Sequence, residues 1–553
     1  MGKRVDWGAI GQWVGVAIGL AAFLASLAGA GFLPDWYDYV WPVLALIGLV
    51  CVAAIILGLA RGADTADEKT TPEPRPRFDP QVVPPPGDLP RGSYLPFVRN
   101  KCFTGRTEDL RALAERLIGQ DPSAAGGQLR LALAGMGGLG KTTLAAEFAH
   151  RYGRYFPGGV FWLNAASAEA LESDLVQCGL SMGLSPWPKE QRQQVAAVLR
   201  AWGEPVGRLV VLDNAAEVKL LREWLGRLQG SQLRLLITTR RPEWPPELGI
   251  PAYGLEVFSP QESRALLRRL APRLEAEPEN GLDAIAGRLG RLPLALDLAG
   301  RYLQDRKDLS AAGYLAELEQ AENALEHTSL KDWVEEAEVP HPASVAAAFE
   351  MSCRRLEAGD ERDELARRLF AAAGYLAPGV PIPREVFRAL AADEAEADRA
   401  LGRLMDLGLL SPAAEGPTIH LLLAEYSRLR SQESGLPQLA GVLLALSGQL
   451  GQTGFPRRFP WLWAHVQEVA EAVETLAPED SARLWGNLGN HLAEVADYQR
   501  AAQLQGRGLE GLTKALGPEH PDVATAHNNL GVTLQHIGDY PAAKQHYEEA
   551  LAL

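Results

Sequence analysis

Gly135-Met-Gly-Gly-Leu-Gly-Lys-Thr-Thr143 sets the architecture of this chain. The apolar run Leu129–Ala134 just before it predicts a buried strand, and Leu144–His150 just after it predicts a helix. The spacing fits the phosphate-binding pattern G-x-x-x-x-G-K-[ST], in which a curled glycine backbone points N–H groups at an anion beside a helix N-terminus. An ordinary glycine-rich turn is the alternative, but it would not require a strand before it and a helix after it. We therefore predict an α/β P-loop domain that binds a nucleotide.

Each residue type in this loop has a chemical role toward a nucleotide. Lys141 can reach the terminal phosphates, and the Thr142 hydroxyl can ligate Mg²⁺. The glycines allow a backbone that brings several N–H groups inward. The predicted nucleotide-binding residues of the loop are Gly135, Gly137, Gly138, Gly140, Lys141, Thr142 and Thr143.

Two later apolar runs end in polar residues, as parallel strands that lead to a bound nucleotide do. Arg208–Asn214 places Asp213 at a strand tip, where a carboxylate can hold Mg²⁺ directly or through water. Leu233–Arg240 places Arg240 at another tip, where a guanidinium can contact a γ-phosphate. A turn aspartate and a surface arginine are the alternatives, and the loop upstream favours the metal role for Asp213.

The composition limits the classes of protein to which the chain can belong. Its 553 residues predict about three or four units at roughly 150 residues each. A formal charge of −15 argues against a dedicated nucleic-acid binder, so no nucleic acid is expected as a partner. The cysteines are scattered without a CxxC pair, which gives no metal site and no disulfide framework and fits a reducing compartment.

The N-terminal part predicts two membrane spans. Gly8–Leu33 and Val40–Ala60 are each long and apolar enough to cross a bilayer as a helix. Basic residues stand before the first run and after the second, while the short turn between them is acidic, so the positive-inside rule places both chain ends in the cytoplasm. A cleavable signal peptide is the alternative for the first run. Residues 1–62 are therefore expected to form a two-pass hairpin, followed by a proline-rich, extended spacer over 63–97.

The order of the motifs resembles the NB-ARC branch of the STAND signal-transduction ATPases. GMGGLGKTT is followed by LVVLDN, by LLITTR and by Gly290–Ala295, while Cys102–Leu110 looks like the N-terminal signature of that family. The similarity covers about residues 98–430. It implies a P-loop domain over 98–253, a helical domain over 254–338 and a winged-helix lid over 339–430.

The resemblance also implies roles for individual residues toward ATP or ADP and Mg²⁺. Lys141, Asp213 and Arg240 would have the catalytic roles, with Thr142 and Asp213 on the metal and Arg240 sensing the γ-phosphate. Pro293 would pack near the adenine and Arg106 would lie at the nucleotide edge. His420 would contact the diphosphate of a closed, resting state, although a packed core histidine is an equal alternative because the motif around it is not intact. Many relatives have an acid after the metal-binding aspartate; Asn214 stands there and cannot act as a base, which predicts slow hydrolysis.

The C-terminal part repeats itself. Asn487-Leu-Gly489 recurs as Asn529-Leu-Gly531, and Asp497-Tyr498 recurs as Asp539-Tyr540, a period of 42 residues. Small and large residues in the second unit follow the pattern of a tetratricopeptide helix pair, whereas a plain amphipathic pair would not repeat these offsets. We predict a helical bridge over 431–480 and an all-α tetratricopeptide solenoid over 481–553, in an array that is truncated or completed by a partner.

These features together predict a membrane-anchored ATP/ADP switch. The repeats would sense a protein ligand, nucleotide exchange would drive self-association, and the hairpin would deliver the response at the membrane. Membrane effectors in prokaryotic relatives suggest bacterial defence, which is an implication of the resemblance. A membrane-tethered repeat scaffold with a structural nucleotide is the alternative, and a transcription regulator ranks last because the N-terminus offers spans instead of a DNA-binding domain.

Overall fold

The computed structural model describes residues 78–119, 128–230, 232–325, 341–356, 361–431, 435–453 and 461–553. The predicted hairpin over 1–62 and the first part of the predicted spacer lie outside these ranges. Within them, no helix combines the length and the apolar character that a membrane span requires.

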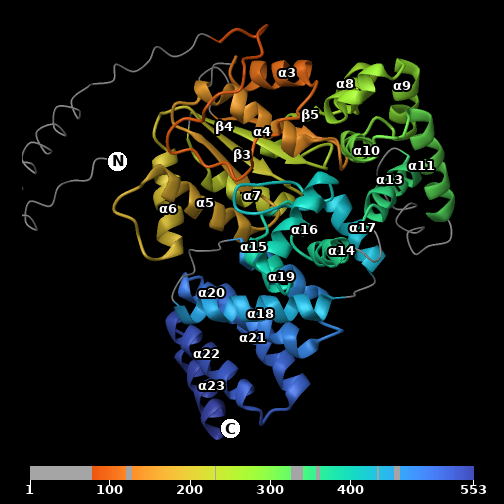
Figure 1. The fold of residues 1–553 in the computed structure, drawn as a ribbon. Coiled ribbons are helices and arrows are strands. Elements are labelled where there is room, and N and C mark those ends of the chain that lie inside the picture. The colour runs from red at the N-terminus through yellow and green to blue at the C-terminus, as the bar shows by residue number, and fades with distance from the viewer. Residues whose placement is uncertain are drawn as a thin grey trace, which may run out of the picture. The chain divides into compact units, whose positions relative to one another are not determined.

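A parallel sheet is the centre of the nucleotide module (Figure 1). Its strand order is β2-β3-β4-β1-β5, so β4 separates the loop-bearing strand β1 from the acid-bearing strand β3. The strands are β1 (Leu129–Ala134), β2 (Val160–Asn164), β3 (Arg208–Asp213), β4 (Leu233–Thr239) and β5 (Ala252–Gly254). Because all pairs are parallel, the carboxyl ends of β1, β3 and β4 meet at one edge, which is where the predicted site lies.

Both faces of the sheet are buried, which explains the continuous apolar runs in its strands. Along β3, Leu209 and Val211 join one hydrophobic core while Val210 and Leu212 join another. The first core contains residues of α3 (Thr107–Leu117) and α4 (Lys141–Tyr152). The second contains residues of α5 (Ala168–Met182), α6 (Gln191–Trp202) and α7 (Val218–Arg227). The result is a sheet covered by helices on both faces.

A helical region follows the sheet. Its elements are α8 (Pro260–Leu270), α9 (Glu279–Arg288), α10 (Pro293–Asp305) and α11 (Ala311–Leu325). The start of α8 is fixed by a capping box, in which the Ser259 hydroxyl accepts from the Glu262 backbone and Glu262 accepts from the Ser259 backbone. Glu262 has a second contact, described below, that ties this helix to the nucleotide module.

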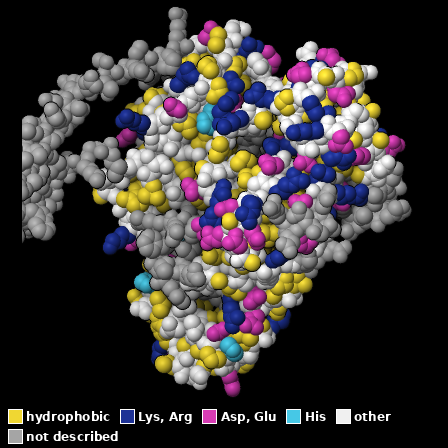
Figure 2. Space-filling model, viewed as in Figure 1, with side chains coloured by type: hydrophobic (Ala, Val, Ile, Leu, Met, Phe, Trp, Pro, Cys, Tyr) yellow, Lys and Arg dark blue, Asp and Glu magenta, His cyan; other side chains and the backbone are white. Residues whose placement is uncertain are grey.

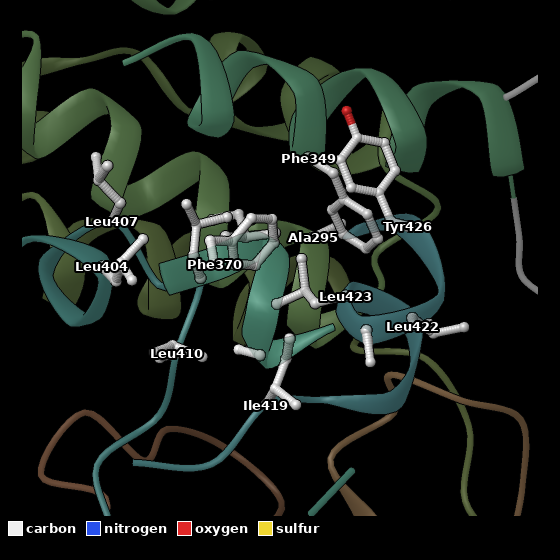
Figure 3. Close-up of a cluster of buried hydrophobic side chains, with 14 of the residues drawn as sticks. Ala295, Phe349, Phe370, Leu404, Leu407, Leu410, Ile419, Leu422, Leu423 and Tyr426 are labelled. Carbon is white, nitrogen blue, oxygen red and sulfur yellow. The ribbon is translucent and has the colours of Figure 1, made fainter. Parts of the chain in front are cut away.

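The third region combines helices with a short antiparallel bridge between Ser411 and Thr418, and the segment around this bridge is called the wing below. Its helices are α13 (Pro342–Arg354), α14 (Glu361–Ala373), α15 (Arg384–Ala389), α16 (Glu394–Asp406) and α17 (Leu421–Ser431). Ser411 and Thr418 exchange backbone hydrogen bonds of 2.9 and 2.8 Å in the wing. Figure 3 shows side chains from α10, α13, α14, α16 and α17 in one buried cluster, so this region and the helical region share a core.

The C-terminal helices form antiparallel pairs. They are α18 (Leu436–Thr453), α19 (Leu462–Ala472), α20 (Pro478–Glu494), α21 (Tyr498–Leu516), α22 (Pro521–Ile537) and α23 (Tyr540–Ala552). Glycines of the repeats allow close approach, since a β-carbon on Gly531 would lie 2.8 Å from the Tyr547 ring. His465 of α19 ties the pairs to the wing region, because its ring nitrogens lie 3.0 Å from the Ala377 nitrogen and 3.0 Å from the Pro381 oxygen.

The described part of the predicted spacer, from Phe78 onward, packs against the nucleotide module and is not a free spacer. The Gly87 nitrogen donates to the His150 oxygen at 2.9 Å, and the Arg151 guanidinium donates to the Pro84 oxygen at 3.0 Å. Tyr94 pairs with the edge strand β2, to which it donates one backbone hydrogen bond and from which it accepts another. Aromatic side chains among the prolines supply the packing surface that composition alone did not reveal.

Candidate nucleotide site

The phosphate loop curls around the N-terminus of α4. Gly138 and Gly140 have φ values of +78° and +82°, a left-handed backbone that glycine adopts at little cost. Gly140 is the N-cap residue of α4, which begins at Lys141, so the free N–H groups of the first turn face the loop. The Lys141 ammonium donates to the Gly135 and Met136 oxygens at 2.7 and 2.8 Å. Burial, and then the charge of Arg240, lower the pKa of Lys141 to about 8, so it is still largely protonated at neutral pH.

Asp213 lies at the tip of β3 beside the loop. Its Oδ1 accepts from the Thr142 hydroxyl at 2.9 Å and from the Thr238 hydroxyl of β4. Burial raises the pKa of Asp213, while the two hydroxyl donors and Lys141 act in the opposite direction. Thr142 and Asp213 therefore present two oxygen ligands side by side, which suits Mg²⁺. Thr143 follows in the first turn of α4 and is half-buried.

Arg240 and the start of α17 lie over the loop from two different regions. A β-carbon on Gly137 would be 3.4 Å from Leu422 Cδ1 and 3.5 Å from an Arg240 guanidinium nitrogen. His420 immediately precedes α17, and its Nδ1 accepts from the Leu422 backbone at 3.2 Å. Burial, followed by the charges of Arg240 and Lys141, lowers the pKa of His420 to about 4, so its ring is neutral at physiological pH.

Arg106 connects three parts of the molecule. Its guanidinium donates to the Leu139 oxygen of the phosphate loop at 3.0 Å and lies 4.7 Å from the Phe258 ring centroid. Its backbone nitrogen donates to Glu262 Oε1 at 2.7 Å, which links the N-terminal signature to α8. Arg106 is only 5% exposed, and in this arrangement it supports the loop from behind.

The Gly290–Ala295 turn packs against the same loop. A β-carbon on Gly138 would be 3.1 Å from the Leu292 side chain, and the Leu294 nitrogen donates to the Gly138 oxygen at 3.2 Å. Pro293 is the first residue of α10, where its missing N–H costs nothing. The helical region therefore contacts the loop through backbone as well as side chains.

The structure brings the sequence-predicted residues together around one loop. Five of them come from segments that span more than 300 residues of chain, and each lies in or beside an element that contacts the phosphate loop or another of the five: Arg106, Asp213, Arg240, Pro293 and His420. Sequence reasoning missed three contributors: Thr238, Glu262 and Leu422. Thr238 could have been found from the polar tip of its strand, but the contacts of Glu262 and Leu422 depend on how distant segments pack.

Asn214 follows Asp213 with a left-handed backbone, φ +61°. Its nitrogen donates to the Thr238 hydroxyl at 2.9 Å, and its side chain is exposed. An amide at this position can orient a water molecule but cannot accept its proton as a carboxylate does.

The C-terminal helices form a groove apart from the candidate nucleotide site. A groove of about 460 Å³ is lined by residues of α18 to α22, among them Asn487, Asn490, His491, Gln505 and Asn529. A smaller pocket shares Trp463 and His491 with it and extends to Asn164, Asp174 and Arg500. The groove therefore continues toward the nucleotide module.

The sheet, the loop and the acid at the tip of β3 define a P-loop nucleotide-binding domain, and the paired C-terminal helices define a tetratricopeptide region. Comparison with known families agrees with both assignments. Residues 106–273 match the NB-ARC domain, and residues 480–553 match a tetratricopeptide repeat family. These matches agree with the NB-ARC part and the tetratricopeptide part of the motif order described above.

The chain is also similar to individual proteins and to a solved structure. The regulatory protein AfsR of Streptomyces griseus is 30% identical over 348 residues, which are 61% of this chain and 33% of that protein. A nucleotide-binding leucine-rich repeat (NLR)-like protein of Hyaloscypha variabilis is 24% identical over 478 residues, 78% of this chain and 46% of that protein. This chain thus spans less than half the length of either relative. The crystal structure of a STAND protein with a tetratricopeptide repeat sensor from Pyrococcus horikoshii aligns at 14% identity and TM-score 0.41, covering 82% of this chain and 77% of that one.

Proposed function

We propose that this chain is a STAND-type ATP/ADP switch, anchored at the membrane by its N-terminal hairpin and triggered by a protein ligand of its repeats. Exchange of ADP for ATP releases the lid and drives self-association. The observation that carries the proposal is the position of the start of α17, whose Leu422 packs on the phosphate loop beside Arg240.

In this proposal the two states of the switch differ in whether α17 contacts the phosphate loop. A lid seated on Gly137 stabilises one arrangement of the loop, and a nucleotide that competes with that contact favours another. In this proposal Arg240 responds to the γ-phosphate, which is supported by its guanidinium at the loop and its exposed side chain. The neutral His420 ring fits this lid, since a charged imidazolium would face two cations.

The repeats supply the input. Arg500 of α21 forms an ion pair with Glu169 of α5, and Arg192 of α6 pairs with Asp497 at 3.0 Å. A ligand in the repeat groove therefore binds helices that directly contact the nucleotide module. A protein ligand that moves these helices changes the surroundings of β2, whose last residue, Asn164, neighbours Asp213 in the sheet.

Slow hydrolysis completes the proposal. A switch keeps its ATP state for as long as hydrolysis is slow, and Asn214 provides no general base at the position where many relatives have an acid. Turnover well below the roughly 1–100 s⁻¹ of phosphoryl-transfer enzymes is expected, and turnover within that range would contradict this part of the proposal.

A regulatory role without membrane output is the second candidate, favoured by the similarity to the regulatory protein AfsR. Acidic side chains lie among the Lys and Arg side chains on the face shown in Figure 2, an arrangement that does not favour a nucleic-acid surface on that face. The two candidates differ in where the chain resides. Resistance of the full-length chain to carbonate extraction from membranes supports the anchored switch, whereas release by carbonate supports the second candidate.

The decisive experiment for the switch is sizing of the full-length chain in mild detergent with ADP or with a slowly hydrolysed ATP analogue. We expect a larger species with the analogue only. Lys141→Ala should abolish this change, while Lys219→Ala, at an exposed lysine of α7, should leave it intact. The switch proposal is wrong if the Lys141→Ala protein still changes size with the analogue, or if the wild type never does. A repeat scaffold with a structural nucleotide would then be the remaining candidate.

A further inference from the structure

Two histidines and a glutamate converge between the helices of the last repeat. His527 lies on α22, and His546 and Glu549 lie one turn apart on α23. The Nδ1 atoms of the two histidines are 2.9 Å apart, and Glu549 Oε2 lies 3.0 Å from the first and 3.4 Å from the second. All three side chains are partly buried. Three atoms that can ligate a metal therefore lie close together between two neighbouring helices, which are labelled α22 and α23 in Figure 1.

The triangle formed by these atoms has the size of a metal site. A point can lie about 2.05 Å from all three atoms, the usual ligand distance of Zn²⁺ with nitrogen and oxygen donors. Seen from that point, the sides subtend angles of about 90°, 94° and 112°. The widest angle is near the tetrahedral value of about 109° and the other two are roughly 15–20° narrower, so a small adjustment of the side chains would let all three ligate one tetrahedral ion, with the fourth position open.

The preceding repeat shows what these positions contain when they only pack. The repeat period of 42 residues places Trp485, Leu504 and Arg507 at the equivalent positions. There the Arg507 guanidinium lies 4.1 Å from the Trp485 ring centroid, a cation–π contact between an aromatic and a basic side chain. In the last repeat all three packing residues are replaced by metal-ligating types. A single histidine would be an ordinary substitution, whereas three coordinated replacements indicate a different role.

The chemistry of the three groups selects the ion. Two imidazole nitrogens and one carboxylate form the donor set that Zn²⁺ uses with an open fourth position, whereas Mg²⁺ and Ca²⁺ prefer all-oxygen ligands. Only one proton fits between the two facing Nδ1 atoms. If the three groups were held by hydrogen bonds alone, a nitrogen lone pair of one histidine would therefore point at the lone pair of the other histidine or at the Glu549 carboxylate. A cation satisfies all three acceptors together.

We propose that His527, His546 and Glu549 form a Zn²⁺ site that links α22 to α23. The link stabilises a helix with little core of its own, because Ala543 is the one buried residue of α23, and Tyr540 and Leu551 are 67% and 86% exposed. The fourth position is open to water or to a donor group of a molecule bound to the repeats. This inference does not depend on the proposed switch.

The test is titration of Zn²⁺ into the full-length chain without a polyhistidine tag, in competition with a chromophoric zinc chelator. We expect one Zn²⁺ per chain at this site, no competition from Mg²⁺, and a higher melting temperature with Zn²⁺. His546→Gln and Glu549→Gln should each weaken Zn²⁺ binding about tenfold or more, since even losing an outer-shell partner costs that much. His536→Gln, at an exposed histidine of α22, is the matched control and should bind as the wild type does.

A second variant tests the site even if single substitutions unfold the repeat. The combined change His527→Trp, His546→Leu and Glu549→Arg rebuilds the packing set of the preceding repeat. It should fold, bind no Zn²⁺ at this site and show a melting temperature that no longer rises with Zn²⁺. The proposal is overturned if the wild type binds no Zn²⁺, or if the rebuilt variant binds and responds to Zn²⁺ as the wild type does.

Discussion

Leu422→Ala should loosen the lid without touching the nucleotide chemistry. Leu422 is 4% exposed, and its Cδ1 packs on the backbone of the phosphate loop at Gly137. Truncation removes apolar contact from the closed arrangement and leaves every predicted phosphate and metal ligand in place. The expected result is faster release of bound ADP.

The size of the effect follows from the burial of Leu422. A buried Leu→Ala change costs about 2–5 kcal/mol, of which only the part that crosses from α17 to the loop weakens the closed lid. Assigning about half of the cost to that contact gives ~1–2.5 kcal/mol, which is about a 5- to 60-fold faster release. The remainder appears as lower stability of the whole unit.

The assay is release of a fluorescent ADP analogue from the full-length chain, chased with unlabelled ADP in a stopped-flow instrument. Leu423→Ala is the matched control, because Leu423 is 1% exposed and lies on the same helix within the core shown in Figure 3. Both variants should melt at lower temperature, and only Leu422→Ala should release ADP markedly faster. Equal release rates for the two variants would refute a lid contact at Gly137.

Three further predictions concern charge and burial. The pKa of His420 is lowered to about 4 in the folded protein, compared with about 6.5 in the unfolded chain. The folded state therefore keeps its full stability above about pH 6.5 and loses stability as the pH falls toward 4. At pH 5 the loss in unfolding free energy is ~2 kcal/mol. Urea unfolding at pH 7.5 and at pH 5 should therefore show a smaller acid loss for His420→Gln than for the wild type, and equal losses would contradict the prediction. Burial raises the pKa of Asp174 to about 7. Its contribution to the stability of the folded state is therefore present below about pH 3.8 and is lost as the pH rises to 7. In thermal unfolding, Asp174→Asn should be more stable than the wild type at pH 8, by up to ~4 kcal/mol, and should not be more stable at pH 4. Arg106→Ala should cost about 3 kcal/mol in denaturant unfolding, because it leaves the Leu139 oxygen without this donor and Asp109 without its ion-pair partner. Arg111→Ala, at a side chain that is 35% exposed, should cost less, and equal costs for the two variants would contradict the prediction.

The sheet and the loop were predictable because their signals are local. The run before Gly135 is apolar without interruption, as a strand buried on both faces must be, and Lys141 follows the last glycine in the register that the loop requires. The positions of Asp213 and Arg240 at strand ends were predictable for the same reason, since each stands at the end of an apolar run. Their convergence at one edge follows from parallel pairing, which the pattern of runs also predicts.

The contacts that close the site could not be predicted in the same way. Glu262 fills a capping box that is visible in sequence, but its bond to the Arg106 backbone joins residues 156 positions apart. Leu422 is one apolar residue among many at the start of a helix, and nothing local marks the one that packs on Gly137. The packing of residues 78–97 was missed because prolines dominate the composition, while the side chains that anchor the stretch, such as Tyr94, are few.

The stretch that pairs with β2 also limits how far the wing can move from the sheet. Tyr94 is hydrogen-bonded to the edge of the sheet, and three residues later Phe97 bridges to Ala413 in the wing, where the Ala414 nitrogen donates to the Pro96 oxygen at 3.1 Å. A tether this short cannot lengthen, so the wing cannot swing away from the sheet without breaking that hydrogen bond or pulling on the chain ahead of it. Tension applied from the N-terminal side of this stretch would therefore act on the sheet and on the wing together, at a place outside the candidate nucleotide site.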